Sequence, residues 1–338
     1  MRKFLFAVVL MLGVFFVIGR FAELQTILAT LRRGDWRFIV LALGVQVVWY
    51  LNAGLNLRIL YRALGLTETV PRLALMAVGA NFFGVVVPSG GMSGLAVFIA
   101  EARREGYPTS RATVAGVAYL FFEYLGFLAV LALGIVVLIR RENLTPAEVG
   151  ASVLMALLAL GLGALLYLGA YSGALLGRVL AALARGGNRL LWPLLHRPYF
   201  SEARARTFGL EAGEGLHIIR RRPYAVLAPA TLGVVSKLLQ IGVLWLTFLA
   251  FHVPYSLGTV VGGYAIAMLF AIISPTPSGV GIVEGVMTVA LNSLNVALGA
   301  AAVITLAYRG ITFWLPFLAG PLAFRALRHL PLTSPPAR

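Results

Sequence analysis

Four charged side chains lie deep within apolar stretches of the sequence. Glu123, Lys237 and Arg309 each lie near the middle of a long apolar segment, and Glu284 follows a run of proline and glycine. Charges at membrane depth are costly in lipid, so they usually face a bundle interior or a water-filled cavity. We expect them to form a polar pathway for a charged headgroup or a coupling ion. Because the two acids balance the two bases, the alternative is a pair of static salt bridges.

Two runs rich in proline and glycine interrupt apolar segments. They read NFFGVVVPSGGMSG over 81–94 and ISPTPSGVGIVEG over 273–285. Such runs at membrane depth leave backbone groups unpaired unless protein or a water-filled cavity surrounds them. We expect two re-entrant helical hairpins, near 73–102 and 257–298; the alternative is that the prolines and glycines only kink packed helices. The pathway candidates in these runs are Asn81, Pro88, Ser89, Gly90, Pro277, Ser278 and Gly279.

The composition places these elements in a lipid bilayer. The chain has 338 residues, of which 60% are hydrophobic and 12% are charged, and its mean hydropathy is +0.91. Soluble domains carry about 25% charged residues, so this chain has too little polar surface to coat a globule. It contains no cysteine, which excludes disulfides, thiol nucleophiles and CxxC metal or redox sites.

Six apolar segments are expected to cross the membrane besides the two hairpins. A spanning helix needs roughly 20 residues. The sequence thus predicts an all-α polytopic protein with eight hydrophobic segments, forming one integral membrane domain over 1–338. Its first half covers 1–145 and its second half 223–338. The expected crossings lie near residues 4–20, 36–57, 111–139, 149–176, 223–251 and 300–323.

The distribution of arginine orients these segments. With both termini cytoplasmic, nearly all the net charge of +16 lies on the inner side, and only Arg32, Arg33 and Arg37 oppose the positive-inside rule. This placement favours the hairpins over full spans, predicts the inner (cytoplasmic) membrane, and explains the charge without a nucleic-acid partner. We expect a cytoplasmic rim that attracts an anionic lipid headgroup, made of Arg58, Arg62, Arg103 and Arg104.

The two halves resemble inverted copies of each other. On this topology the first hairpin opens from the cytoplasm and the second from the outside, and both contain proline-serine-glycine. In the crossing after each hairpin, Glu123 lies eleven residues before Gly134, and Arg309 lies eleven residues before Gly320. Inverted repeats with broken helices at the midplane are how many transporters build a site reachable from either side.

The segment 177–222 alternates nine arginines with leucines, as an interfacial amphipathic helix does. We expect it to rest on anionic headgroups, with a solvated helical face as the alternative. Just before it, Gly169, Gly173 and Gly177 form a GxxxGxxxG ridge. This ridge is expected to serve close helix packing, either within the bundle or between protomers of a homo-oligomer.

Several kinds of catalysis lack their residues. Ser93 lies in a GxSG sequence that is typical of intramembrane serine proteases, but none of the four histidines is placed at membrane depth beside it. There is no HExxH and no GxxxxGK[ST], and Asp35 is the single aspartate. We therefore expect no enzyme activity, no metal, no cofactor and no ATP-driven pumping by this chain.

A family resemblance rests on four of these segments. Asn81 with the following PSGG, FFEYLGF around Glu123, SPTPSGVGIVEG ending in Glu284, and YRGITFWLPFLAG from Tyr308 resemble the lysylphosphatidylglycerol synthase transmembrane region family. Members are often called flippase-like integral membrane proteins, and the resemblance covers nearly the whole chain.

The resemblance implies movement of a lipid between leaflets. In two-domain members the membrane unit flips an aminoacylated lipid made by a soluble synthase domain, which is not expected in this sequence. We therefore expect a translocase for a phospholipid or polyprenyl-linked lipid. The alternatives are a non-transporting partner of a lipid-synthesising enzyme and a secondary transporter of a small solute.

Overall fold

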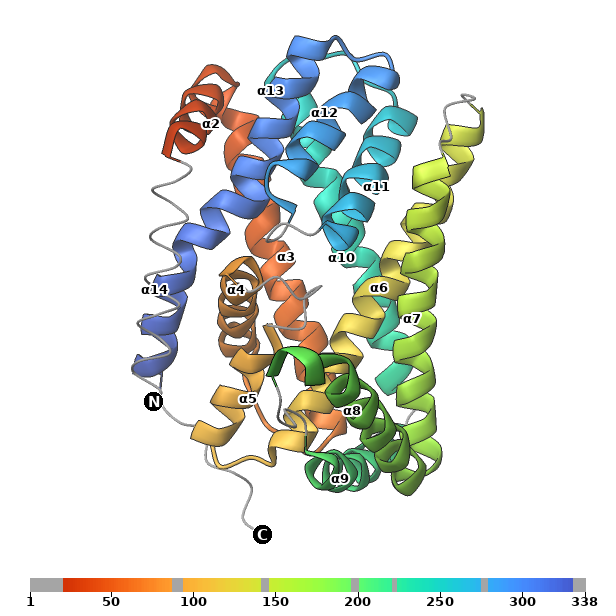
Figure 1. Cartoon of the computed structure of the whole chain (residues 1–338). Coiled ribbons are helices and arrows are strands. Elements are labelled where there is room, and N and C mark those ends of the chain that lie inside the picture. The colour runs from red at the N-terminus through yellow and green to blue at the C-terminus, as the bar shows by residue number, and fades with distance from the viewer. Residues whose placement is uncertain are drawn as a thin grey trace.

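The computed structural model describes residues 21–86, 94–140, 146–195, 201–220, 224–274 and 279–330, and these ranges are helical with no strand. Figure 1 shows the arrangement. In chain order the elements are α2 (Phe21–Arg33), α3 (Trp36–Ala63), α4 (Val70–Val86), α5 (Leu95–Arg104), α6 (Thr109–Arg140), α7 (Pro146–Tyr171), α8 (Gly173–Leu195), α9 (Glu202–Arg220), α10 (Tyr224–Ala250), α11 (Leu257–Ile273), α12 (Ile282–Ser293), α13 (Leu298–Arg309), a π-helical turn η3 (Gly310–Trp314) and α14 (Leu315–His329).

Long apolar helices match four of the predicted crossings. Within the described residues, the stretches 36–63, 109–136, 226–250 and 298–327 are long and apolar enough to span a membrane. Their outer faces carry large apolar side chains, such as Leu133 and Leu322. The segment predicted over 149–176 corresponds to the 26-residue helix α7, which ends at Tyr171, so that residues 173–176 belong to α8. The segment predicted over 4–20 lies outside the described residues.

Helices α3 and α10 lie side by side and run in opposite directions. The backbone N–H of Asp35, just before α3, donates to the carbonyl of Ala250, the last residue of α10, at 2.8 Å. The C-terminal end of α3 therefore lies at the opposite end of the bundle from that of α10. Since α4 follows α3 and α11 follows α10, the pairs α4–α5 and α11–α12 begin at opposite ends (Figure 1).

The crossing helix of each half packs against the broken segment of the other half. A Cβ atom placed on Gly134 of α6 would lie 2.6 Å from Cβ of Ala265 in α11. Likewise, one placed on Gly320 of α14 would lie 2.6 Å from Cβ of Phe82 in α4. These are the two glycines that share the eleven-residue spacing. The spacing thus marks two equivalent close approaches between the halves.

The described part of the basic segment 177–222 belongs to a pair of packed helices, α8 and α9. Methyl groups at Gly173 and Gly177 of α8 would overlap the backbone of α9, near Gly209 and Gly213. The glycine ridge is therefore a helix-packing surface within the chain, as one of the two packing alternatives predicted. The exposed residues Arg178, Arg185 and Arg206 lie on this pair.

Glycine also sets the closest approach of α6 and α10. Gly126 and Gly233 face each other so closely that a methyl group on either would overlap the backbone of the other helix. Small residues allow such contacts in membrane bundles, where dispersion attraction and interhelical hydrogen bonds hold helices together. The crossing lies within four residues of both Glu123 and Lys237, so it determines whether those side chains can meet.

We predict that Gly233→Ala destabilises the protein, because the added methyl must push α6 and α10 apart. The expected cost is about 1–3 kcal/mol, measured as a lower melting temperature in detergent. Gly242→Ala on the same helix is the matched control, since a methyl there meets no atom within 4 Å. That control should be neutral or stabilising by up to about 1 kcal/mol. Equal melting temperatures for the two variants would contradict the assignment.

Candidate functional site

A cavity of about 350 Å³ lies at the centre of the bundle. Helix α4 lines it with residues that include Ala77 and Val85, and α5 lines it with Phe98. Helices α11 and α12 contribute Met268 and Val283. The two broken segments thus approach one space from opposite ends of the bundle. Its charged and amide lining comes from Asn81, Glu123, Lys237, Gln240 and Arg309.

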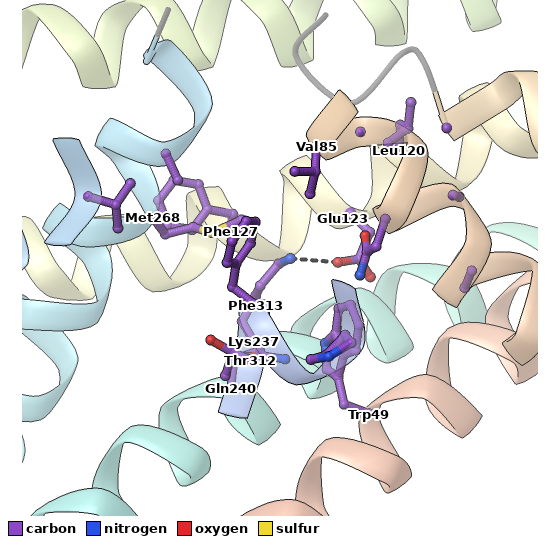
Figure 2. Close-up of a pocket in the computed structure, with 18 of the residues that line it drawn as sticks. Trp49, Val85, Leu120, Glu123, Phe127, Lys237, Gln240, Met268, Thr312 and Phe313 are labelled. Carbon is purple, nitrogen blue, oxygen red and sulfur yellow. Dashed lines mark hydrogen bonds and ion pairs between the residues drawn. The ribbon is translucent and has the colours of Figure 1, made fainter. Parts of the chain in front are cut away.

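Glu123 of α6 and Lys237 of α10 form a buried ion pair at this cavity. Lys237 Nζ lies 2.5 Å from Glu123 Oε2, and Figure 2 shows the two side chains pointing toward each other. The hydroxyl of Ser236 donates to the same oxygen at 3.0 Å, and Trp49 Nε1 donates to that hydroxyl at 2.8 Å. Helices α3, α6 and α10 therefore converge on one carboxylate.

The second ion pair joins α12 to α13. Arg309 Nε lies 2.7 Å from Glu284 Oε1. The other oxygen of Glu284 accepts from the backbone N–H of Gly281 at 2.7 Å, at the N-terminus of α12, where a negative charge is favourable. The guanidinium also lies over the ring of Phe313, 4.2 Å from its centroid. Glu284 does not line the cavity directly; Arg309 does.

A π-helical turn follows Arg309 immediately. Single π-turns inside α-helices frequently occur at functional sites, since the extra residue changes the direction of neighbouring side chains. Here the turn, Gly310–Trp314, lies between Arg309 and the cavity-lining Phe317. Ile27 of α2 packs against it, where a Cβ on Gly310 would lie 2.6 Å from the isoleucine.

The glycines of the second broken segment are required by their backbone conformation. Gly279 has φ +74° and Gly281 has φ +84°, in the left-handed region that side chains with a Cβ rarely adopt. They shape the entry into α12 and so the position of Glu284. The other candidates in the two runs, Pro88, Ser89, Gly90, Pro277 and Ser278, lie outside the described residues, as does Ser93.

Neutral polar side chains connect neighbouring helices around the cavity. Asn81 donates to the hydroxyl of Tyr50 at 2.9 Å, and Gln240 donates to Gln46 at 3.2 Å. The hydroxyl of Tyr308 donates to Gln240 at 3.3 Å, and Asn52 donates to the carbonyl of Leu232 at 3.0 Å. The amide side chains of Asn81, Gln240 and Asn52 thus make hydrogen bonds between helices.

Sequence reasoning missed Trp49, Ser236 and Tyr308. For Trp49 a signal was present as helical spacing: the polar or amphipathic residues 46, 49, 52 and 56 recur every three or four positions along α3. This spacing places them on one helix face. That face contacts α10, which runs antiparallel to α3. Gln240 donates to Gln46, Trp49 donates to Ser236, and Asn52 donates to the carbonyl of Leu232.

The predicted cytoplasmic rim has two exposed and two half-buried members. Arg62 and Arg103 are exposed, Arg58 is half-buried, and Arg104 donates to the carbonyl of Leu327 at 2.8 Å and lies 3.4 Å from Glu101. Nearby Arg72 is buried and pairs with three glutamates, Glu68, Glu101 and Glu105. The arginines at this end are therefore partly neutralised by acids that also tie α4 to α5.

The described residues contain no group of three or more histidine, cysteine or acidic side chains that could hold a metal ion.

Comparisons with known proteins point to one family. The family model for the lysylphosphatidylglycerol synthase TM region matches residues 4–320 of the chain. The UPF0104 membrane protein MJ1595 of Methanocaldococcus jannaschii is 30% identical over 109 residues, which are 32% of each of the two chains. The match thus spans about a third of that relative's length.

We predict that the ion pair of Glu123 and Lys237 behaves as a unit. Lys237→Met leaves a buried carboxylate without its counter-charge, which should cost about 3–5 kcal/mol. The double variant Glu123→Gln/Lys237→Met removes both charges and should recover most of that loss. Melting temperatures in detergent for the wild type, both single variants and the double variant form the test. Additive losses in the double variant would show that the two charges do not interact.

Proposed function

Because this chain belongs to the lysylphosphatidylglycerol synthase transmembrane region family, we propose that it is a lipid translocase. In this proposal a phosphate-bearing headgroup of a phospholipid or polyprenyl-linked lipid crosses the membrane through the central cavity. Its acyl chains remain in the surrounding lipid. The activity is transport and not a chemical transformation.

One observation carries this proposal: a cavity lined by three charged side chains lies between two broken helical segments. Apolar packing alone does not require Glu123, Lys237 and Arg309 to face a common space in the interior. Charges at such positions in membrane proteins mark polar pathways. A volume of about 350 Å³ is at the small end of ligand pockets, which suits a headgroup better than an entire lipid.

We infer that the pairs α4–α5 and α11–α12 are the two re-entrant hairpins. Each of these four helices has 17 residues or fewer, whereas a span needs roughly 20. The antiparallel order of α3 and α10 supports insertion from opposite sides, and Val85, Gly94 and Ser274, which border the two breaks, line the cavity. Alternating access to that cavity would then come from movements of one half against the other.

The distribution of arginine along the bundle supports an orientation of the chain in the membrane. The end of the bundle that carries Arg62, Arg103 and the α8–α9 pair is richer in arginine than the end that carries α2. By the positive-inside rule, we propose that this end is cytoplasmic, and with it both termini. The exposed arginines of α8 and α9 would then lie near anionic headgroups of the inner leaflet.

The energy source follows from the residues available. The sequence holds no nucleotide-binding loop, so we propose downhill or ion-coupled movement. Glu123 is the better candidate for carrying a coupling proton. Lys237 and Ser236 both donate to the same oxygen of the Glu123 carboxylate, so its other oxygen is available to hold a proton. In Glu284, by contrast, each of the two oxygens accepts a hydrogen bond.

The proposal predicts that the purified full chain accelerates lipid movement in liposomes. Acyl-labelled fluorescent lipids and quenching by dithionite give the rate of exchange between leaflets. The double variant Glu123→Gln/Lys237→Met should slow it about tenfold or more, because the paired charges line the path. Glu211→Gln on the exposed face of α9 is the control and should match the wild type. Wild-type rates equal to those of protein-free vesicles, for anionic, zwitterionic and polyprenyl-phosphate lipids, would contradict translocation. They would favour a non-transporting partner of a lipid-synthesising enzyme or a transporter of small solutes.

The topology makes a separate prediction, for which the chain needs no background substitutions because it has no cysteine. In intact cells, a membrane-impermeant maleimide should label Leu257→Cys at the start of α11 but not Arg62→Cys near the end of α3. Both positions are exposed, so the contrast reports sidedness. Permeabilised cells should label both. Strong labelling of Arg62→Cys in intact cells would overturn the proposed orientation and the inverted hairpins with it.

A further inference from the structure

One oxygen of the Glu123 carboxylate has no hydrogen-bond partner among the described residues. Lys237 and Ser236 both bind Oε2, while Oε1 is buried and unpartnered. The residue lines the central cavity and is 8% exposed. A buried carboxylate oxygen without a donor is unfavourable, so a ligand that brings a cation to this oxygen gains an interaction that the protein does not supply: a hydrogen bond from a primary ammonium, or a charge contact with a quaternary ammonium.

Aromatic residues line the same cavity as Glu123. Tyr119 and Phe127 line it from positions four residues before and four residues after Glu123, on the same face of α6. Trp49 lines it from α3 and is joined to the carboxylate through Ser236. Aromatic faces attract ammonium groups, most strongly where water is excluded. A carboxylate that shares a cavity lining with aromatic residues suits an organic cation.

Two cationic side chains in the same lining suit an anion. Lys237 and Arg309 line the cavity from α10 and α13, and each carries N–H donors that match phosphate oxygens. Each cation, however, is already balanced by a carboxylate, Glu123 or Glu284. A phosphate diester entering alone would add an uncompensated negative charge to a low-dielectric interior, which costs several kcal/mol.

We propose that the cavity binds a zwitterionic headgroup, with its phosphate at Lys237 and Arg309 and its ammonium at Glu123. The headgroup brings one charge of each sign, so the total in the cavity is unchanged. The ion pair of Glu123 and Lys237 is exchanged for two pairs with the ligand. This inference rests on the proposed translocase function and narrows its substrate to phosphoethanolamine-type or phosphocholine-type lipids. It replaces the anionic headgroup that the rim arginines suggested.

Transport selectivity tests the proposal. The full chain is reconstituted in liposomes with trace acyl-labelled phosphatidylethanolamine, phosphatidylcholine, phosphatidylglycerol or phosphatidic acid, whose headgroups remain unmodified. We expect the zwitterionic lipids to move about tenfold faster than the anionic ones. Glu123→Gln should remove most of this preference, with Glu211→Gln as the matched control. Faster movement of phosphatidylglycerol or phosphatidic acid would overturn the zwitterion assignment and leave translocation standing.

Binding tests the site independently of transport. Glycerophosphoethanolamine should raise the melting temperature of the detergent-solubilised wild type, whereas glycerophosphoglycerol should not. The shift should be lost in Glu123→Gln, provided that this variant melts as cooperatively as the wild type. A selective shift without lipid movement would support the site and contradict the translocase. Equal shifts from both compounds, or none, would overturn the site. Uptake of labelled glycerophosphoethanolamine into the vesicles, without lipid movement, would assign the same site to a solute transporter.

Discussion

The requirement that every buried charge be paired within the protein dominates this structure. Glu123, Lys237 and Arg309 are each less than 10% exposed. Glu123 and Lys237 lie well inside α6 and α10, and Arg309 lies near the middle of the apolar stretch 298–327. Lipid offers such groups no partners, so each must find its counter-charge on another helix. The two resulting ion pairs join α6 to α10 and α12 to α13, and they fix the positions of those helices around the central cavity.

Backbone contacts make this pairing possible. Glu123 reaches Lys237 because Gly126 and Gly233 bring α6 and α10 together at one point. The polar face of α3 then adds Trp49, which orients Ser236 toward the same carboxylate. Phe122 belongs to one hydrophobic core cluster and Phe127 to the next, so the charged pair lies at the boundary between two packed regions. Preorganised charges at such a boundary can respond to movement of one region against the other.

Each half of the chain also packs against the other half. Gly134 approaches α11 and Gly320 approaches α4, so each broken segment rests on a crossing of the opposite half. Movement of one segment therefore changes contacts in both halves. The cluster of Arg72 with three glutamates ties α4 to α5 at one end. At the other end, the hydroxyl of Thr259 in α11 donates to the carbonyl of Leu294, which follows α12, at 3.4 Å.

The sequence alone determined the all-helical membrane class, four of the long apolar helices and the four charges to be examined. Hydropathy and the cost of buried charge depend only on local composition, which a single chain displays. It could not determine which acid meets which base, because salt bridges between helices depend on distances set by distant residues such as Gly126 and Gly233. The tertiary structure made those pairs, brought in Trp49 and Ser236, and divided 149–176 at Ser172, where that hydroxyl accepts a helix-starting hydrogen bond from Leu175. It also left one carboxylate oxygen of Glu123 unpartnered among the described residues, because Lys237 and Ser236 approach the carboxylate from the same side.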